Sequence, residues 1–370
     1  MFDQNFFDSV YDRTNTGAIK YNNLPENTIP MWIADMDFKS PPAVTDALIN
    51  VAQHGIYGYG DTDEEYDSLI VDWYNRRFRW KIEKEQIVKV PGVMFGVAAA
   101  IRAITVPNEA VLICQPVYYP FAKIIPENHR RTVVSELKLK DGRYEIDFED
   151  FESKIKQNKV KIFLLCSPHN PVGRLWTKEE LTRIAEICLK YGVYIISDEI
   201  HSDFIYPVHK QIPIASLSEE IADRTITCLS PTKTFNLAGL QAANIIVPNL
   251  ALQQRVRKEC ASTGYSHLNI MAVTATKAAY RNGENWLDAS LEYLQQNVAL
   301  LRAAFPESYY TTEEYIIPYF YYNILYISFV VAKKHRRNDA LEYQLFSNGK
   351  VTCQYPFVIF LQVTNSPYGV

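Results

Sequence analysis

The fold of this chain can be predicted from residues 160–201, which read VKIFLLCSPHNPVGRLWTKEELTRIAEICLKYGVYIISDEIH. This stretch begins and ends with short apolar runs, each followed by polar residues, which is the pattern of buried strands. Between the runs, Thr177 and Glu180 have the spacing of a capping box that starts a helix, and Gly192 stands where a left-handed residue ends one. The stretch therefore predicts a strand, a helix and a second strand, the repeating unit of a parallel sheet.

The same alternation of apolar runs and helical patterns extends from this unit in both directions. Buried strands are expected at 110–114, 160–166, 193–197, 225–229 and 244–247. Alternating strands and helices indicate an α/β fold, in which a mostly parallel sheet is covered by helices on both faces. Ligands bind at the carboxyl ends of the strands in such sheets, so the polar residues that follow each strand are the candidate site residues.

Composition narrows the class of protein. The 370 residues, at roughly 150 per domain, predict about two domains. Hydrophobic residues make up 48% and charged residues 22%, which is typical of a soluble globular protein and too apolar for disorder. The net charge of −4 gives no indication of nucleic-acid binding.

Cysteine usage and the first residues indicate the compartment. The six cysteines are scattered, so no metal site is expected, and free thiols suit a reducing environment. Asp3 and Asp8 stand where a signal peptide would be basic, which favours the cytoplasm. The uncharged run 316–332 is short for a membrane span and contains Pro318, so we expect buried strands there and no membrane association.

Three polar segments follow predicted strands and are expected at the same edge of the sheet. They are Ser-Pro-His-Asn-Pro-Val-Gly-Arg (167–174), Asp-Glu-Ile-His (198–201) and Ser-Pro-Thr-Lys-Thr-Phe-Asn-Leu-Ala-Gly-Leu (230–240). Together they offer a carboxylate, an amide, hydroxyls and one lysine amine. A lysine among hydroxyls suits covalent attachment of a cofactor aldehyde beside a phosphate, and a buried Asp can hold a protonated pyridine nitrogen.

These segments resemble the fold-type I, pyridoxal 5'-phosphate (PLP) dependent enzymes of the class I/II aminotransferase superfamily. Within it, the sequence is most similar to the PatB/MalY-like cystathionine β-lyase (C–S lyase) branch. Further segments that carry the resemblance are Pro-Met-Trp-Ile-Ala-Asp-Met-Asp-Phe (30–38), Pro-Gly-Val (91–93) and Pro-Val-Tyr-Tyr-Pro-Phe (116–121). The resemblance implies the aspartate aminotransferase-like fold, with a large PLP-binding domain over 46–279 and a smaller α/β domain built from 1–45 and 280–370.

The resemblance also implies roles around the cofactor ring. Lys233 is expected to attach PLP and to take the Cα proton of the substrate. Asp198 is expected to pair with the pyridine nitrogen, Asn170 to bond the ring 3′ oxygen, and Tyr118 to stack on the ring. His201 stands where aminotransferases commonly have Tyr, and either an approach to the cofactor or a packing role is open for it.

Other residues are expected at the cofactor phosphate. Ser230 and Thr232 would donate their hydroxyls. The backbone N–H groups of three residues that precede a helical run would add the positive end of a helix; these are Gly92, Val93 and Met94. Tyr59 resembles the tyrosine that reaches the phosphate of the neighbouring subunit, which implies a homodimer with shared active sites. A structural role as a turn, a cap or a core aromatic is the alternative for each of these residues.

The implied activity is PLP-dependent C–S β-lysis of a small amino-acid substrate. Cystathionine or a cysteine S-conjugate would yield a thiol, pyruvate and ammonia. Gln241 stands where many aminotransferases have a phosphate-binding Arg, which favours the lyase branch. An aminotransferase on the same scaffold and a non-catalytic PLP-binding or regulatory protein are the alternatives. A NAD-binding enzyme is disfavoured because no GxGxxG follows an early strand.

The resemblance stops at about residue 302. The family's arginine that grips the substrate carboxylate has no counterpart, because no Arg follows Arg337. Ten of the 25 tyrosines lie after residue 302, so the tail is atypical and reads as a frameshifted or degenerate segment. We therefore expect PLP binding to be retained and turnover to be weakened or lost, unless another group such as Arg13 holds the carboxylate.

Overall fold

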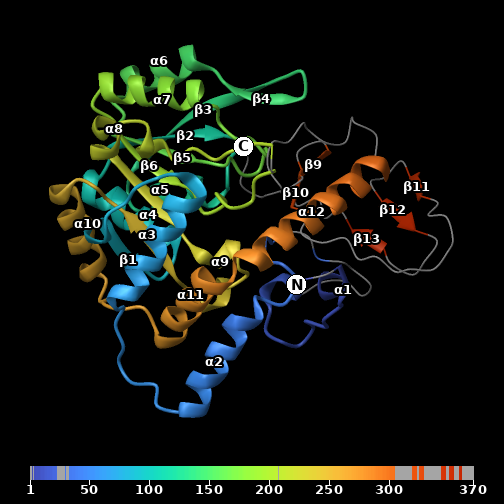
Figure 1. Ribbon diagram of the computed structural model, residues 1–370. Helices are drawn as coiled ribbons and strands as arrows, with labels where there is room; N and C mark the ends of the chain where they lie inside the picture. The colour runs from blue at the N-terminus through green and yellow to red at the C-terminus, as the bar shows by residue number, and fades with distance from the viewer. Residues whose placement is uncertain are drawn as a thin grey trace.

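The computed structural model describes residues 2, 4–22, 30, 33–206 and 208–304, together with the short strands β9 to β13 beyond residue 318 (Figure 1). Those strands form two small antiparallel sheets. Their bounds are β9 Tyr319–Tyr322, β10 Leu325–Ser328, β11 Tyr343–Phe346, β12 Lys350–Cys353 and β13 Val358–Phe360. Apart from these strands, the tail that was predicted to be frameshifted or degenerate and the apolar run 316–332 within it lie outside the described residues. No helix in the described part of the chain is long and apolar enough to cross a membrane.

An eight-stranded mixed sheet forms the centre of the molecule, in the order β1-β8-β7-β6-β5-β2-β3-β4. The five strands from β7 to β3 in this order run parallel, whereas β1, β8 and β4 pair antiparallel with their neighbours. The strand bounds are β1 Ile87–Val90, β2 Ala110–Gln115, β3 Arg131–Lys140, β4 Arg143–Ile146, β5 Ile162–Cys166, β6 Tyr194–Asp198, β7 Thr225–Leu229 and β8 Ala243–Ile246.

All five predicted strands are present, and the predicted α/β sheet is confirmed. The strand β6 begins and ends one residue later than expected, so Asp198 is its last residue. The predicted helix is α7, where Thr177 and Glu180 form the expected capping box. Gly192 has the left-handed φ of 68° that the sequence required.

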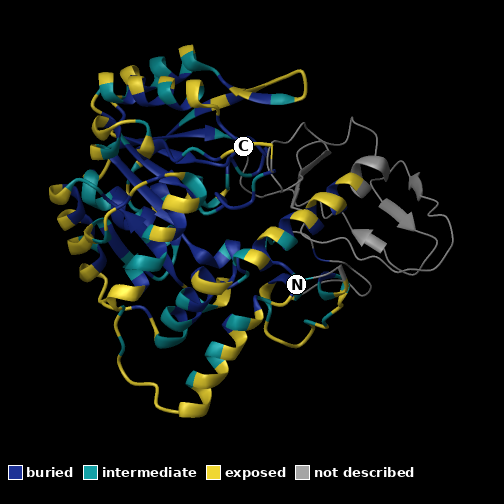
Figure 2. Cartoon of the chain, in the orientation of Figure 1, coloured by how far each residue is buried: buried dark blue, intermediate teal, exposed yellow. Residues whose placement is uncertain are grey.

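The helices cover the sheet as its side chains dictate. Alternate residues of each strand point to opposite faces; in β5, Ile162 and Leu164 belong to the cluster with α4, α5 and α10, and Phe163 and Leu165 to the cluster with α6 and α7. Figure 2 shows the buried sheet between helices whose outer faces are exposed. The helix bounds are α1 Gln4–Asp8, α2 Pro42–His54, α3 Glu64–Phe78, α4 Val93–Ile104, α5 Pro120–Glu127, α6 Phe148–Asn158, α7 Lys178–Lys190, α8 Glu219–Asp223, α9 Pro231–Thr234, α10 Leu250–Ser262, α11 Ile270–Asn282 and α12 Glu284–Ala304.

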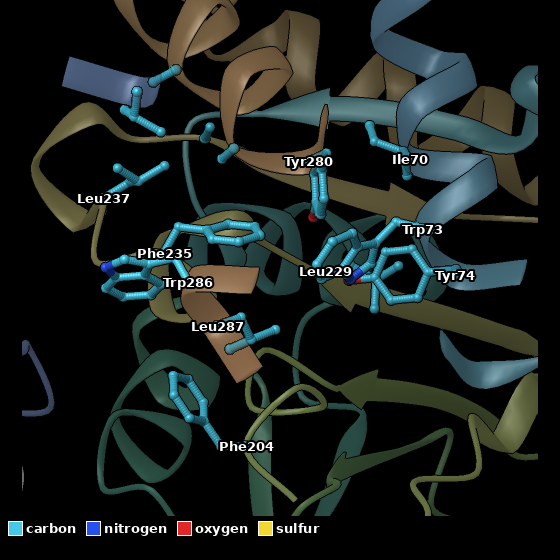
Figure 3. Packing of buried hydrophobic residues seen from close by; sticks show 14 of the residues in the cluster. Ile70, Trp73, Tyr74, Phe204, Leu229, Phe235, Leu237, Tyr280, Trp286 and Leu287 are labelled. Carbon is cyan, nitrogen blue, oxygen red and sulfur yellow. The ribbon is translucent and has the colours of Figure 1, made fainter. Parts of the chain in front are cut away.

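A third hydrophobic cluster, which contains many aromatic residues, packs beside the sheet (Figure 3). The ring of Phe235 lies 5.4 Å from that of Trp73 and 5.7 Å from that of Tyr280, both edge to face, and 6.4 Å from that of Trp286. A Cβ atom at Gly283 would lie 2.5 Å from Phe235 Cε1, so only glycine fits there. This packing fixes the segment around Phe235 in the core.

Residues of the N-terminal helix α1 and of the helix α12 meet in this cluster. Phe7 of α1 stacks on Tyr293 of α12 at 5.3 Å, and the hydroxyl of Tyr293 donates to Asp8 Oδ1 at 2.8 Å. A small domain built from both chain ends requires such contacts. The division into 46–279 on one side and 1–45 with 280–370 on the other stays a prediction.

Candidate active site

The three polar segments meet at one edge of the sheet, as predicted. Asp198 at the end of β6 lies in register with Cys166 at the end of β5 and with Cys228 near the end of β7. Because these three strands run parallel, the segments that follow them leave the sheet on the same side. The candidate residues are therefore brought together by strand order and register.

Lys233 lies on α9, a helix of four residues that directly follows β7. Its two following neighbours anchor it. Thr234 Oγ1 donates to the buried carboxylate of Asp203 at 2.8 Å, and Phe235 fills the aromatic cluster described above. Asp203 also forms an ion pair with Arg77 of α3, at 3.2 Å. A hydrogen bond from Thr234 and the packing of Phe235 therefore fix the segment that carries Lys233 to the core.

The amine of Lys233 donates to the main-chain oxygen of Ala34 at 2.7 Å. Burial lowers the pKa of this lysine, the carboxylates of Asp35 and Asp198 act in the opposite direction, and the ammonium of Lys20 adds to the lowering. A lysine with a lowered pKa loses its proton more readily, and the neutral amine is the form that acts as a nucleophile or a base.

Asp198 is the buried carboxyl of the site. Its Oδ1 accepts a hydrogen bond from the N–H of Ile200 at 3.1 Å. Burial raises the pKa of Asp198 to about 7, opposed by that hydrogen bond and by the charge of Lys233. Among the residues that the structure describes, no cation forms an ion pair with it. A buried carboxylate in this condition is suited to a positively charged group of a ligand.

His201 and Tyr118 lie close enough to these two groups to feel their charges. Burial, with a smaller contribution from the charge of Lys233, lowers the pKa of His201 to about 3, so its ring is neutral. Burial, with a smaller contribution from Asp198, raises the pKa of Tyr118 to about 12. The Tyr118 ring packs edge to face on Phe121 at 5.8 Å. Both predicted residues are therefore in the site, and Tyr118 also has a packing role.

The loop after β5 carries Asn170. Its N–H donates to Cys166 Sγ at 3.3 Å, which folds the loop back over the end of the strand. His169 ties this loop to the loop that carries Tyr118, because its Nε2 donates to Pro116 O at 2.8 Å. Burial lowers the pKa of His169 to about 4, so this ring is neutral and remains a donor near neutral pH.

Gly92, Val93 and Met94 lie at the N-terminus of α4, as predicted. Gly92 is the N-cap residue, and α4 begins at Val93. Among the residues that the structure describes, no side chain caps this end of the helix. Its first N–H groups are therefore available to bind an anion. Gly96 lets the helix approach the sheet, because a Cβ atom there would lie 2.4 Å from Ile245 Cδ1.

Ser230 and Thr232 have buried hydroxyls at the start of α9. Ser230 Oγ accepts from the N–H of Thr232 at 3.0 Å and donates to Ala242 O at 2.6 Å. The two hydroxyls lie 2.6 Å apart. Both groups lie at the predicted edge, but the Ser230 proton is used within the protein, so its predicted donation to a phosphate would require a rearranged hydroxyl.

Tyr59 is the predicted residue that the structure does not bring to the site. It lies in the segment between α2 and α3 and is fully exposed, as are Ile56 and Tyr57 in large part. Within its own chain, the Tyr59 side chain is therefore not part of the site.

Sequence reasoning missed the contribution of the N-terminal segment. The motif 30–38 carried part of the resemblance, yet none of its residues was given a role. In the structure, Ala34 contacts Lys233 and Asn236 bonds to Met36, in each case across about 200 residues of sequence. A pocket of about 240 Å³ opens between this segment and the loop after α9. Only the motif itself pointed to these residues, because no local spacing links such distant positions.

The residues present fit PLP. The site combines a lysine amine with a lowered pKa, a buried carboxylate without a cationic partner among the described residues, and an uncapped helix N-terminus. These groups match the aldehyde, the pyridine nitrogen and the phosphate of that cofactor.

Comparisons with known proteins agree with this geometry. Residues 26–356 match the family Aminotransferase class I and II. Cystathionine β-lyase PatB of Bacillus subtilis is 41% identical over 297 residues, which are 79% of this chain and 77% of PatB. Protein MalY of Escherichia coli is 32% identical over 318 residues, which cover 83% of this chain and 80% of MalY.

A solved structure extends the similarity to three dimensions. Cystalysin of Treponema denticola, whose crystal structure contains a pyridoxal 5'-phosphate cofactor, superposes with a TM-score of 0.82 at 33% identity, covering 86% of this chain and 83% of cystalysin. The chain therefore belongs to the class I and II aminotransferase family, in its PLP-dependent, PatB/MalY-like cystathionine β-lyase branch.

Proposed function

We propose that this chain is a PLP-dependent C–S β-lyase that cleaves cystathionine or a related cysteine S-conjugate into a thiol, pyruvate and ammonia. The observation that carries the proposal is that Lys233 and Asp198 lie at the same sheet edge, close enough for each to influence the pKa of the other. One is an amine with a lowered pKa, and the other is a buried carboxyl that senses its charge. Membership of the lyase branch supports the same reaction.

When bound, PLP supplies an electron sink for the charge that develops on the substrate Cα. The residues of the chain bind, orient and move the proton. Lys233 would hold the cofactor and, once released by the substrate amine, would accept the Cα proton, a task suited to an amine with a lowered pKa. The carboxylate of Asp198 would keep the pyridine nitrogen protonated.

The remaining site residues would orient the cofactor. Tyr118 would stack on the ring and Asn170 would bond its 3′ oxygen. His201, being neutral and buried near Lys233, would pack at the cofactor without adding a charge. The phosphate would meet the start of α4 at Gly92, Val93 and Met94, and the hydroxyls of Ser230 and Thr232.

The exposure of Tyr59 supports a homodimer in which this tyrosine reaches the phosphate of the neighbouring subunit. Its exposed neighbours Ile56 and Tyr57 would be buried in the same contact. Sedimentation of the purified chain should show a dimer, and Tyr59→Phe should weaken PLP retention without changing the sedimentation. A monomeric, fully active chain would contradict this assignment.

We also propose a cytoplasmic location. The five cysteines whose environment is described are free and buried. Free thiols of this kind suit a reducing compartment.

Pyruvate formation tests the proposed reaction. The purified full-length chain, loaded with PLP, should release pyruvate and homocysteine from cystathionine, and Lys233→Ala should abolish both products. Transfer of the amino group to a keto acid without thiol release would identify an aminotransferase. PLP bound through Lys233, with no turnover of any thioether amino acid, would identify a binding or regulatory protein, which the missing C-terminal arginine favours.

A further inference from the structure

Asn236 lies three residues after Lys233 and has no part in the function proposed above. We propose that Asn236 is a positioning residue, whose side-chain amide sets the register of the N-terminal segment 34–38 and so holds the Ala34 carbonyl on the amine of Lys233. This inference rests on the proposed lyase function, since it names a residue on which the behaviour of the catalytic lysine depends.

The side-chain amide of Asn236 forms three hydrogen bonds to the main chain of the segment 34–38. The N–H of Met36 donates to Asn236 Oδ1 at 3.0 Å. Asn236 Nδ2 donates to Met36 O and to Phe38 O, each at 2.9 Å. Binding both the N–H and the C=O of one residue reproduces the pairing between neighbouring strands, which specifies a single register.

The backbone of Asn236 is held in a conformation that aims its side chain at this segment. Its φ is +59°, in the left-handed region that asparagine tolerates better than most residues. The hydroxyl of Ser40 donates to the main-chain oxygen of Asn236 at 3.1 Å. The segment and the lysine loop are therefore tied by the side chain and by the main chain of one residue.

The register matters because the contact with Lys233 is only two residues from Met36. The Lys233 amine donates to Ala34 O at 2.7 Å. A slip of the segment by one residue would reverse which groups face the lysine. The Ala34 carbonyl would then no longer face the Lys233 amine. Asp35, whose carboxylate raises the pKa of Lys233, would be displaced as well.

The groups that face Lys233 determine how a shift of the segment 34–38 would change the pKa of its amine. The carboxylates of Asp35 and Asp198 favour its ammonium form, while burial and the ammonium of Lys20 disfavour it. The Ala34 carbonyl adds an acceptor for the charged form. Loss of that acceptor, and displacement of Asp35, would make the ammonium a stronger acid.

The test removes the amide and keeps the backbone. Asn236→Gly retains the left-handed conformation, because glycine adopts it freely, and deletes all three side-chain hydrogen bonds. In the full-length cofactor-free chain, acylation of Lys233 by acetic anhydride is followed against pH by mass spectrometry. We expect the acid dissociation constant of the Lys233 ammonium to rise about tenfold. In the PLP-loaded chain, we expect kcat for pyruvate release to fall by one to two orders of magnitude, roughly, with KM little changed.

Asn269→Ala is the matched control. Asn269 Nδ2 also donates to a main-chain oxygen of the loop after the lysine, that of Leu240, at 3.1 Å, and its Oδ1 caps α11. Its loss should lower the thermal midpoint and leave the labelling of Lys233 unchanged. If Asn236→Gly does not fold, Ser40→Ala takes its place, with a rise of about threefold expected.

An unchanged pH profile of Lys233 labelling in the folded variant would overturn the inference. A profile that shifts equally in Asn269→Ala would do the same, since it would show a general loosening of the loop. Failure of the proposed lyase function is a separate result, visible as a wild-type chain that releases no pyruvate, and the labelling experiment does not depend on turnover.

Discussion

Carboxylates flank Lys233 on two sides, and the chain treats them in opposite ways. On the sheet side, Asp198 is buried, and burial raises its pKa to about 7. On the side of the N-terminal segment, Asp35 and Asp37 are bound by Arg13 and by the fully buried Lys20, at distances of 2.7 to 3.5 Å. A carboxylate that is satisfied by the protein fixes structure, whereas one that is left without a cation is available to a ligand.

The largest effect on activity is expected at Asp198. Asp198→Asn keeps the shape and removes the charge, so pyruvate release should fall by about three orders of magnitude while the free energy of unfolding of the cofactor-free chain stays equal or rises. Activity assays and thermal unfolding of the same samples measure both. A variant that is active but unstable would show that Asp198 is a structural residue.

The opposite pattern is expected at Lys20. Lys20→Met deletes the ammonium that donates to Asp35 O and to Asp37 Oδ2, and should destabilise the chain by about 3 kcal/mol. Lys39→Met is the control, because Lys39 is exposed and packs over the Tyr11 ring at 4.6 Å. Equal chemical denaturation midpoints for the two variants would refute a structural role for the buried ion cluster.

The raised pKa of Asp198 also makes the stability of the chain depend on pH. The pKa of Asp198 is raised from 3.8 to about 7 in the folded chain, so the stability that this group contributes is present at low pH and is lost as the pH rises through that interval. His201 and His169, whose pKa values are lowered, act in the opposite direction, so the wild-type curve alone does not isolate Asp198.

The difference between the wild-type chain and Asp198→Asn does isolate it. Relative to the variant, the cofactor-free wild-type chain should lose about 4 kcal/mol of stability between the two ends of that interval. Denaturant unfolding at several pH values measures this difference. A difference that does not vary with pH would mean that folding does not raise the pKa of the Asp198 carboxyl.

The smallest effect is expected at Arg13. Its guanidinium binds both oxygens of Asp35 and one oxygen of Asp37. Arg13→Lys keeps the charge and loses the two-pronged contact, which should cost about 1 kcal/mol of stability and leave KM unchanged. A roughly tenfold rise in KM would instead show that Arg13 holds the substrate carboxylate.

Local sequence patterns were sufficient for five of the eight strands of the sheet and for the polar residues at its edge, but not for β1, β3 and β4. Those five strands, the capped helix α7 and the polar strand ends were predictable because short apolar runs and capping chemistry act over a few residues. The contact of Ala34 with Lys233 and the binding of Asn236 to Met36 were not, because they join segments about 200 residues apart. The satisfied state of Asp35 and Asp37 likewise depends on Arg13 and Lys20, whose side chains the pattern cannot orient.

The α/β class, the positions of the polar segments that follow the strands and the family could all be read from the sequence, since they depend on apolar and helical patterns and on short motifs. The tertiary structure alone decided which carboxylates are satisfied and which one is open, because burial and pairing are properties of the folded environment and change a residue's charge without changing its identity. Asp198 and Asp35 are the same amino acid beside the same lysine, and only packing separates their roles.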